Sequence, residues 1–395
     1  MTITERGTGH AASAGYRSDV VLSVRDLRVR FSRAGRSVHA VNGLSYELRA
    51  GKMLAIIGES GSGKSVSVRA LMGLLPPSAY VAGSAMLGDI ELVGMSDKRM
   101  REIRGADISM VFQDPTRSLN PTMSVGAQIT EAIRTKNTVN RKVAAERSVE
   151  LLKLVRLPAA ERRYHEYPHQ LSGGMRQRVM IAIALASNPK VLIADEATTA
   201  LDVTTQAQIM ELLVDLQDRL GTAVIMISHD LGLAASYADD VLVMYAGEAV
   251  EKAETATLFQ NVRMPYTKAL LGAIPQLTTV PHSLLTVIGG HPPDLSQIPP
   301  GCPFQPRCPR AVAKCAEHPP LAEHEPRHWY ACWNPVPSGE DWALAQPADG
   351  VPAEDDTLDD AEQLITEGFV PPVEPLLTAG VIPSEDNAPK KGEQA

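Results

Sequence analysis

Residues 58–65 read Gly58-Glu59-Ser60-Gly61-Ser62-Gly63-Lys64-Ser65, a G-x-x-x-x-G-K-S sequence. The apolar run at 53–57 before it is typical of a buried strand, and the pattern of 66–74 after it predicts a helix. Glycines let the backbone turn tightly and direct successive N–H groups at phosphate oxygens, and the following helix adds its positive N-terminal end. Lys64 supplies a mobile charge for the β- and γ-phosphates, and the Ser65 hydroxyl is placed to ligate Mg²⁺. The stretch therefore predicts a nucleotide site between a strand and a helix.

The composition excludes several classes of protein. The 395 residues are 44% apolar, enough for a buried core, whereas the net charge of -8 and the aromatic content of 4% disfavour a nucleic-acid-binding role. No apolar run approaches the roughly 18 residues that a membrane span needs. Residues 1–19 lack the apolar segment of a signal peptide and predict a disordered leader. We expect a cytosolic chain that does not itself cross a membrane.

Two segments, one before and one after the phosphate loop, contain further candidate residues of the nucleotide site. Residues 20–48 alternate between apolar and polar positions, which predicts an antiparallel pair of strands beside the nucleotide core. Phe31 lies there and either stacks on an adenine ring or is a half-buried strand aromatic; the sequence favours neither. Gln113 follows a short apolar strand and reaches Mg²⁺ and the attacking water if that strand lies beside the loop. Residues 124–158 are mainly helical and predict an insertion with a surface for a partner.

A second predicted helix start can bind an anion. Ser172-Gly173-Gly174 precedes a long apolar helix and offers a hydroxyl and bare N–H groups. The strand predicted at 190–196 ends in two carboxylates: Asp195 suits an outer-sphere contact to Mg²⁺, and Glu196 suits polarising the water that attacks the γ-phosphate. The next predicted strand ends in His229, which suits a hydrogen bond to the γ-phosphate.

These motifs occur in the order found in ABC-transporter ATP-binding subunits, which the chain resembles over residues 20–274. The run Leu-Ser-Gly-Gly-Met-Arg-Gln-Arg at 171–178 resembles the peptide-importer branch of that family. The resemblance implies an α/β P-loop NTPase fold with an antiparallel β subdomain and a helical insertion at about 114–168. It also implies that Ser172, Gly173 and Gly174 complete the ATP site of a partner subunit, and that Asp202 of the Ala200-Leu201-Asp202 motif belongs to the nucleotide-binding residues.

The four cysteines of the chain gather near its C-terminal end. Cys302, Cys308, Cys315 and Cys332 follow a C-x5-C-x6-C-x16-C spacing, which lacks the paired C-x-x-C of most zinc sites. Four structural thiols remain an alternative, but their clustering in one proline-rich stretch favours a metal. Residues 264–270 and 300–308 resemble the C-terminal extension of oligopeptide and dipeptide importer ATPases, although Met264 stands where the family has His. That resemblance implies a structural [4Fe-4S] cluster on the four thiolates, with Zn²⁺ as the alternative.

The resemblance also implies a function. We expect residues 275–335 to form the extension and the acidic, Pro- and Ala-rich residues 336–395 to be largely disordered. The chain is expected to hydrolyse ATP with Mg²⁺ and to drive uptake of di- or oligopeptides. Its expected partners are a second ABC ATPase in a heterodimer, two transmembrane permease subunits and an extracytoplasmic substrate-binding protein, at the cytoplasmic face of the inner membrane.

Two alternatives stay open. The same machinery can import nickel, glutathione or oligosaccharides, because the ATPase subunit does not touch the cargo. A soluble ABC ATPase that acts on nucleic acid or ribosomes is the second alternative. The single phosphate loop and the acidic charge of the chain oppose this second alternative.

Overall fold

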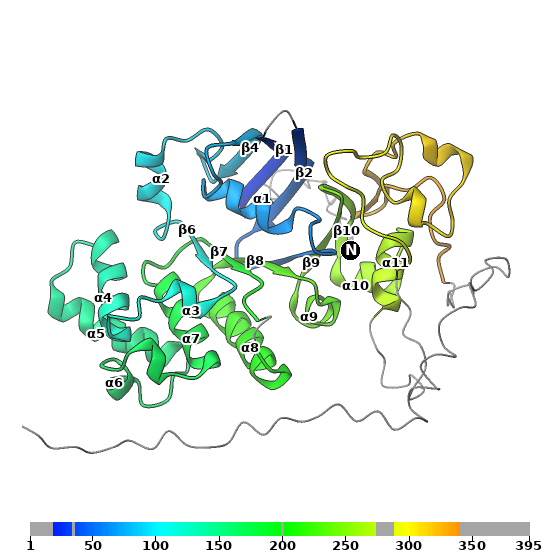
Figure 1. Ribbon diagram of the computed structural model, residues 1–395. Helices are drawn as coiled ribbons and strands as arrows, with labels where there is room; N and C mark the ends of the chain where they lie inside the picture. The colour runs from blue at the N-terminus through cyan, green and yellow to red at the C-terminus, as the bar shows by residue number, and fades with distance from the viewer. Residues whose placement is uncertain (1–18, 34–35, 199–200, 274–287, 340–395) are drawn as a thin grey trace, which may run out of the picture. The chain divides into compact units, whose positions relative to one another are not determined.

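The chain forms two β-sheets joined by a shared core (Figure 1). The computed structural model describes residues 19–33, 36–198, 201–273 and 288–339. The leader expected over residues 1–19 and the acidic tail expected over 336–395 lie almost entirely outside the described residues.

The larger sheet positions the phosphate loop. Its described strands lie in the spatial order β11 (Ala322–Glu325), β12 (His328–Tyr330), β10 (Glu248–Glu254), β9 (Asp240–Tyr245), β3 (Met53–Ile57), β8 (Ala223–Ser228), β7 (Val191–Asp195) and β6 (Ile108–Val111). The strands from β9 to β6 are parallel to one another. Every residue of β3, β7 and β8 is buried, which explains their continuous apolar sequence.

The smaller sheet is antiparallel and packs beside the nucleotide core. Its described strands lie in the order β2 (Arg36–Arg49), β1 (Val20–Arg33), β4 (Ala79–Leu87) and β5 (Ile90–Glu91). The strand pair expected over residues 20–48 is therefore confirmed as β1 and β2, which pair from Val20 with Arg49 to Arg33 with Arg36. The third strand, β4, was not predicted because its residues alternate weakly between apolar and polar.

Alternate residues of β3 serve two different cores. Leu54 and Ile56 pack with the smaller sheet and with α1 (Lys64–Leu71). Met53, Ala55 and Ile57 pack on the opposite face of the sheet, against the helices of the middle of the chain. Because successive side chains of a strand point to opposite faces, one short strand anchors both layers. The loop that follows β3 is thus held between two packed layers.

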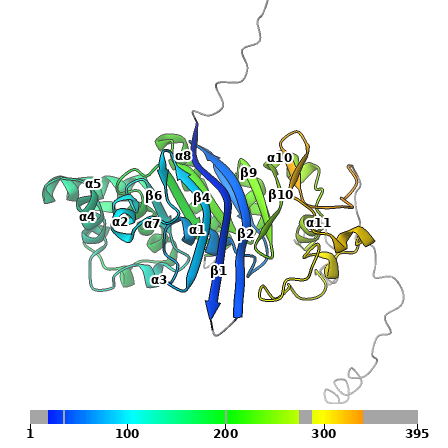
Figure 2. The same cartoon turned by 90° about the horizontal axis from the view of Figure 1, so that it is seen from above.

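Of the remaining helices, α2 (Asp97–Ile103) packs in the same core as α1 and the smaller sheet, and most of the others cover the opposite face of the larger sheet (Figures 1 and 2). The helical insertion is confirmed: α3 to α6 gather with α7 beside the β6 edge of the sheet. The bounds of these others are α3 (Pro115–Ser118), α4 (Val125–Lys136), α5 (Arg141–Leu154), α6 (Ala160–Arg163), α7 (Gly173–Ala184), α8 (Val203–Leu220), α9 (Leu231–Tyr237), α10 (Thr255–Gln260) and α11 (Pro265–Gly272). Short 3₁₀ turns span Pro168–Gln170, Gln305–Arg307 and Ala313–Ala316.

Residues 288–339, the C-terminal segment, join the opposite end of the same sheet (Figure 2). Its strand β12 pairs antiparallel with β10. Phe304 packs edge-on against Tyr245 and Tyr266, with ring centroids 5.3 Å apart in both pairs. The C-terminal segment therefore extends the larger sheet and its hydrophobic core. Among the described residues, every helix is too short or too polar to span a bilayer.

Candidate nucleotide site

The phosphate loop connects β3 to α1, as the sequence predicts. Lys64 is 5% exposed, and its Nζ donates to the carbonyl oxygens of Gly58 at 2.8 Å and Glu59 at 2.9 Å. Burial lowers the pKa of Lys64, and the carboxylates of Glu196, Asp195 and Glu59 offset part of that effect. The ammonium group is thus held by neutral carbonyls in a site whose burial favours an anionic ligand.

Two glycines make the loop geometry possible. Gly58 has φ of 149°, and a Cβ there would lie 2.2 Å from the carbonyl oxygen of Met244. Gly63 has φ of 98°, and a Cβ there would lie 2.3 Å from the carbonyl oxygen of Ala40. Both contacts are with backbone that cannot move aside without disturbing β9 or β2. Between them, the buried hydroxyl of Ser62 has no hydrogen-bond partner among the described residues.

Ser65 and Asp195 come from different elements and meet directly. The Ser65 hydroxyl donates to Asp195 Oδ1 at 2.6 Å, and Arg69 donates to Asp195 Oδ2 at 3.0 Å. Asp195 ends β7 and is 1% exposed, so its charge is balanced by these two partners. Sequence analysis did not single out Arg69, although it lies one helical turn after Ser65 and so shares its helix face.

Gln113 and Glu196 also come together. Gln113 Nε2, beyond the end of β6, donates to Glu196 Oε2 at 2.7 Å. Glu196 adopts φ of 50°, which is rare for a residue with a side chain. Its backbone N–H donates to the carbonyl oxygen of Ile227 at 3.2 Å. The chain turns sharply after β7 and places the carboxylate at the carboxyl edge of the parallel strands, beside the phosphate loop.

The second predicted anion site begins α7. Ser172 is its N-cap, and the Ser172 hydroxyl accepts from the N–H of Met175 at a long 3.4 Å. A Cβ on Gly174 would lie 2.6 Å from Cγ2 of Thr205, whereas Gly173 meets only the Leu201 side chain at 3.6 Å. The Ser172-Gly173-Gly174 segment therefore packs closely on the start of α8. Within the single chain, Ser172 does not hydrogen-bond to the phosphate loop.

Three residues predicted for the nucleotide site, Asp202, His229 and Phe31, make no hydrogen bond to the phosphate-loop side chains described above. Asp202 caps α8 by accepting from the N–H of Thr205 at 2.9 Å and its hydroxyl at 2.7 Å. These bonds lower the pKa of Asp202. His229 is exposed just after β8, and Phe31 is partly buried on β1 against the core of the smaller sheet. Ala200 lies outside the described residues.

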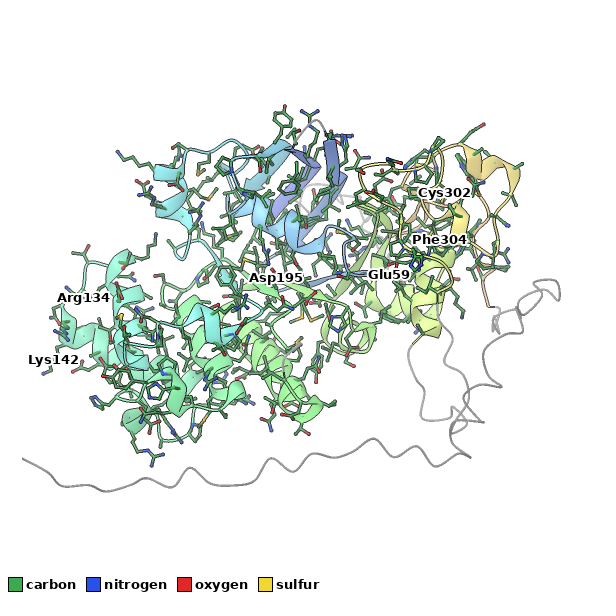
Figure 3. The ribbon with its side chains drawn as sticks, in the orientation of Figure 1. Glu59, Arg134, Lys142, Asp195, Cys302 and Phe304 are labelled. Carbon is green, nitrogen blue, oxygen red and sulfur yellow. The ribbon has the colours of Figure 1, made fainter. Side chains whose placement is uncertain are left out.

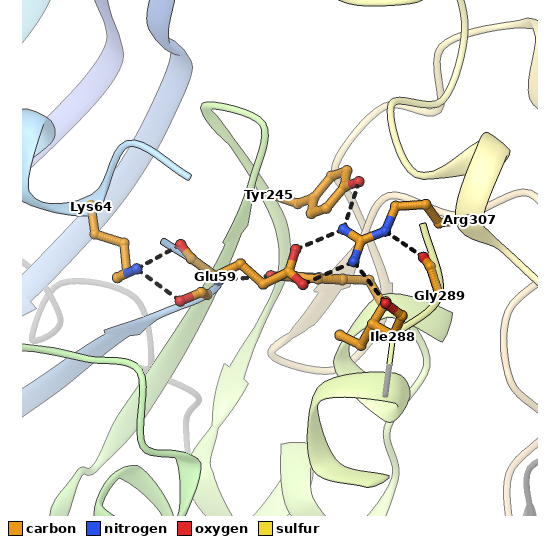
Figure 4. A network of polar contacts seen from close by, with 8 residues as sticks. Glu59, Lys64, Tyr245, Ile288, Gly289 and Arg307 are labelled. Carbon is orange, nitrogen blue, oxygen red and sulfur yellow. Dashed lines mark hydrogen bonds and ion pairs between the residues drawn. The ribbon is translucent and has the colours of Figure 1, made fainter. Parts of the chain in front are cut away.

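The outer side of the loop carries contacts that sequence analysis missed. The N–H of Glu59 donates to the Tyr266 hydroxyl at 2.9 Å, and the Glu59 carboxylate accepts two hydrogen bonds from Arg307, at 2.7 and 3.0 Å (Figure 4). Figure 3 shows Glu59 between Asp195 on one side and Cys302 and Phe304 of the C-terminal segment on the other. No local pattern predicts these pairs, because 207 residues separate Glu59 from Tyr266 and 248 separate it from Arg307.

The residues present fit an ATP phosphate chain and Mg²⁺. The loop offers a buried ammonium group, a Ser62 hydroxyl without a hydrogen-bond partner among the described residues, and a tight backbone turn that a Cβ at position 58 or 63 would prevent. The hydroxyl of Ser65 and the carboxylate of Asp195 are oxygen donors of the kind that Mg²⁺ prefers. Both ligands would therefore meet complementary groups at this loop.

The four cysteines are free thiols within the C-terminal segment. Burial raises the pKa of Cys308 to about 11 and that of Cys332 to about 12, and in each case the neighbouring thiols of Cys302 and Cys315 contribute. The N–H of Cys302 donates to the carbonyl oxygen of Cys315 at 2.9 Å. Among the described residues, no three His, Cys, Asp or Glu side chains are arranged as ligands of a single metal ion. The thiols thus gather in one core without forming a ready single-ion site.

A groove of about 700 Å³ opens between β6 and the helical insertion. Apolar side chains of Met110, Phe112, Met180 and Ile183 line it together with polar side chains of α4. Phe112 is 40% exposed there. The groove lies beside Gln113 and is distinct from the phosphate loop.

Comparisons with known proteins agree with this arrangement. The ABC transporter family matches residues 41–199, and the family described as "Oligopeptide/dipeptide transporter, C-terminal region" matches residues 250–315. The oligopeptide transport ATP-binding protein OppD of Escherichia coli (strain K12) is 48% identical over 336 residues, 85% of this chain and 99% of that protein. The dipeptide transport ATP-binding protein DppD of Bacillus subtilis (strain 168) is 48% identical over 79% of this chain and 94% of its own length.

Solved structures of ATP-binding cassette proteins match the fold of this chain. The ATP-binding cassette MJ0796, in a dimeric post-hydrolysis state bound to ADP and Pi, matches with a TM-score of 0.54 and 28% identity, over 59% of this chain and 98% of that one. CbiO1 from Clostridium perfringens matches with a TM-score of 0.53 and 30% identity, over 61% of this chain and 91% of that one. The chain belongs to the ABC-transporter ATP-binding subunits of the oligopeptide/dipeptide transporter family.

Proposed function

We propose that this chain hydrolyses ATP to drive the import of di- or oligopeptides through membrane partners. The observation that carries the ATPase part is the meeting of Ser65 with Asp195 at 2.6 Å and of Gln113 with Glu196 at 2.7 Å, beside a buried Lys64. The peptide cargo rests on the relatives, which are named for oligopeptide and dipeptide transport.

The side chains divide the chemistry among them. Lys64 and the loop N–H groups bind the phosphates. Ser65 and Asp195 would hold Mg²⁺, and its positive charge would offset the negative charge of the phosphates. Glu196 accepts the proton of the attacking water, and Gln113 orients that carboxylate. His229, exposed after β8, hydrogen-bonds the γ-phosphate, and Phe31 stacks on the adenine.

The working unit is proposed to contain two ATPase chains. Ser172, Gly173 and Gly174 begin α7 without a hydrogen bond to the loop of their own chain, so they are available to complete a second chain's site. We propose a heterodimer, with Asp202 next to the facing nucleotide. Two permease subunits and an extracytoplasmic substrate-binding protein complete the importer, and this chain is peripheral at the cytoplasmic face of the membrane.

The groove beside β6 is proposed to receive a helix of a permease subunit. Its apolar side chains and exposed Phe112 suit the apolar face of a helix, and the neighbouring Gln113 links it to Glu196. Phe112→Asp is expected to abolish co-purification with the permeases. Val143→Asp changes another exposed apolar residue, on α5, and is the matched control. Equal retention of both variants would exclude the groove.

The test of the function is ATP hydrolysis by the complex reconstituted in membranes. We expect hydrolysis to rise when the binding protein is loaded with short peptides. Stimulation by oligosaccharides, glutathione or a nickel chelate in place of peptides would replace the cargo and keep the mechanism. Hydrolysis that ignores every loaded binding protein, in a chain that does not follow the membrane fraction, would favour a soluble ABC ATPase.

The four thiols are proposed to hold a structural [4Fe-4S] cluster, with Zn²⁺ as the alternative. In support, all four pack against one core, and a cluster needs ligands spread around several iron atoms rather than one ion. Such a clip would stabilise a segment too short to bury a core of its own. Anaerobic purification followed by iron, sulfide and zinc assays tests it. Stoichiometric zinc without sulfide would replace the cluster, and four metal-free thiols would remove both.

The domain boundaries are part of the same proposal. We assign residues 20–274 to the cassette, with the insertion at about 114–168, and residues 275–335 to the extension. The pairing of β12 with β10 supports an extension that folds onto the cassette rather than apart from it. Limited proteolysis tests this assignment, because cuts inside 20–274 would contradict it.

A further inference from the structure

The phosphate loop contains an acidic residue, which is unfavourable beside a polyanionic ligand. Glu59 follows the first glycine of the loop, and its carbonyl oxygen accepts a hydrogen bond from the Lys64 ammonium group at 2.9 Å. The Glu59 charge is close enough to affect the pKa of Lys64. A free carboxylate here would repel the phosphates of ATP and compete with them for Lys64 and for loop N–H groups.

Arg307 removes that carboxylate from the loop. Its Nη1 donates to Glu59 Oε2 at 2.7 Å and its Nη2 donates to Oε1 at 3.0 Å, a two-pronged ion pair (Figure 4). The Arg307 side chain is 5% exposed and that of Glu59 is 23% exposed. Because the pair is largely shielded from solvent, it is not one of the exposed pairs that contribute little.

The guanidinium group is itself held in place. It donates to the carbonyl oxygens of Gly289 at 2.9 Å and Ile288 at 3.3 Å, and to the Tyr245 hydroxyl at 3.3 Å. It also lies 6.0 Å from the ring centroid of Phe304. The C-terminal segment therefore presents one fixed positive charge to one loop residue, and Figure 4 shows Gly289, Ile288 and Tyr245 around the Arg307 guanidinium that bonds Glu59.

We propose that Arg307 is a positioning residue for ATP binding: it neutralises Glu59 and turns its carboxylate away from the phosphate cradle. Together with the Tyr266 hydroxyl on the Glu59 N–H, it fixes the outer side of the loop while Lys64 holds the inner side. The C-terminal segment thereby sets the nucleotide affinity of the cassette. This inference rests on the proposed binding of ATP at the loop.

The test is a charge cycle measured by calorimetric titration of the full-length chain with ATP·Mg²⁺. Arg307→Met is expected to weaken binding on the order of tenfold, as one uncompensated nearby charge would. The double variant Glu59→Gln with Arg307→Met is expected to recover affinity to within about twofold of the wild type, because no carboxylate then needs neutralising. A double variant as weak as Arg307→Met would overturn the proposal and leave a purely structural role.

Two further variants separate charge from folding. Arg307→Lys keeps a positive charge and is expected to retain most of the affinity; if it binds no better than Arg307→Met, neutralisation is not the cause. Arg263→Met breaks another shielded pair of this region, with Glu325 at 3.1 Å, and is expected to lower the unfolding temperature without changing ATP affinity. If it weakens ATP binding as Arg307→Met does, general loosening explains both. Failure of the wild type to bind ATP would instead refute the proposed function.

Discussion

The lowered pKa of Lys64 in the nucleotide-free chain makes ATP affinity depend on pH. Burial lowers its pKa in the free chain, and the phosphates of bound ATP would raise it again. The complex then holds more protons than the free chain, so ATP affinity falls as the pH rises through the free-state pKa of Lys64. That free-state pKa lies below the usual lysine value of about 10.4.

Calorimetric titration over a series of pH values up to about 10.4, each in two buffers with different ionisation enthalpies, measures the protons exchanged on binding. We expect proton uptake in the wild type and none in Lys64→Arg, which stays charged over that series. Proton release on ATP binding would contradict this account of Lys64.

Glu196 is the residue on which hydrolysis, as opposed to binding, is expected to depend. Its carboxylate is oriented by Gln113 at 2.7 Å and held on a strained backbone with φ of 50°. Glu196→Gln removes the proton acceptor and keeps the shape, so hydrolysis is expected to fall at least about 100-fold while ATP remains bound. Single-turnover assays and size-exclusion chromatography with ATP measure this. Brisk hydrolysis in this variant would assign the proton acceptor to another residue.

At the scale of elements, two helix caps that look alike in sequence differ in the structure. Asp202 accepts bonds of 2.9 and 2.7 Å at the start of α8, whereas Ser172 accepts one of 3.4 Å at the start of α7. Asp202→Ala is expected to lower the free energy of unfolding more than Ser172→Ala does, because it removes two shorter hydrogen bonds rather than one long one. Ser172→Ala is nevertheless expected to abolish hydrolysis in the assembled complex.

Denaturant unfolding of each variant, beside the ATPase activity of the complex, checks both expectations. If Ser172→Ala is as unstable as Asp202→Ala and its activity falls in proportion to stability, Ser172 is only a cap and has no role toward a facing nucleotide.

Two glycines of the phosphate loop, Gly58 and Gly61, differ in how closely they approach β9. Gly58 and Gly61 both have positive φ, but a Cβ on Gly58 would lie 2.2 Å from the Met244 carbonyl oxygen and one on Gly61 would meet nothing within 4 Å. Gly61→Ala should destabilise the nucleotide-free chain by about 1 kcal/mol, from backbone strain alone. Gly58→Ala should cost roughly 2–4 kcal/mol, because the clash is added. Thermal unfolding without nucleotide measures both, and equal losses would show that β9 yields easily.

At the scale of the whole molecule, the C-terminal segment is expected to depend on its thiols. Cys302 and Cys315 are 8% and 6% exposed and lie in the core that also contains Phe304. Replacing both with Ser removes two ligands and buries two hydroxyls, so we expect the bound metal to be lost and the free energy of unfolding to fall by several kcal/mol. Val312→Ala, at a side chain 39% exposed in the same segment, is the control. Unchanged metal content and stability in the cysteine variant would contradict a metal clip.

The buried end of this segment explains why it stays on the cassette. Glu251 on β10 and His328 on β12 are both fully buried, and His328 Nε2 lies 2.9 Å from Glu251 Oε1. Glu251 also accepts the N–H of Arg263 at 2.7 Å. A buried polar pair is tolerated only where its partners are fixed, so these contacts specify how β12 registers on β10.

Local sequence patterns are enough to predict the nucleotide-binding loop and the α/β architecture around it. The phosphate loop, the apolar strands that end in Gln113, Asp195 and His229, and the alternation over 20–48 are local patterns, and local patterns follow from backbone sterics and the period of each element. Parallel strands then bring their carboxyl ends to one edge, which is why the chain's pattern alone predicts that Asp195 lies near Ser65.

Long-range packing, by contrast, selects the side chains that contact the phosphate loop from outside. Arg307 and Tyr266 reach Glu59 across 248 and 207 residues, and Arg69 reaches Asp195 across 126. The third strand of the smaller sheet and the pairing of β12 with β10 are likewise long-range choices. Such contacts depend on how the layers of the fold pack against one another. No sequence period or motif predicts which residue pairs with a given charged side chain. The sequence therefore specified what binds at the phosphate loop, and the packing of the C-terminal segment specified what holds that loop.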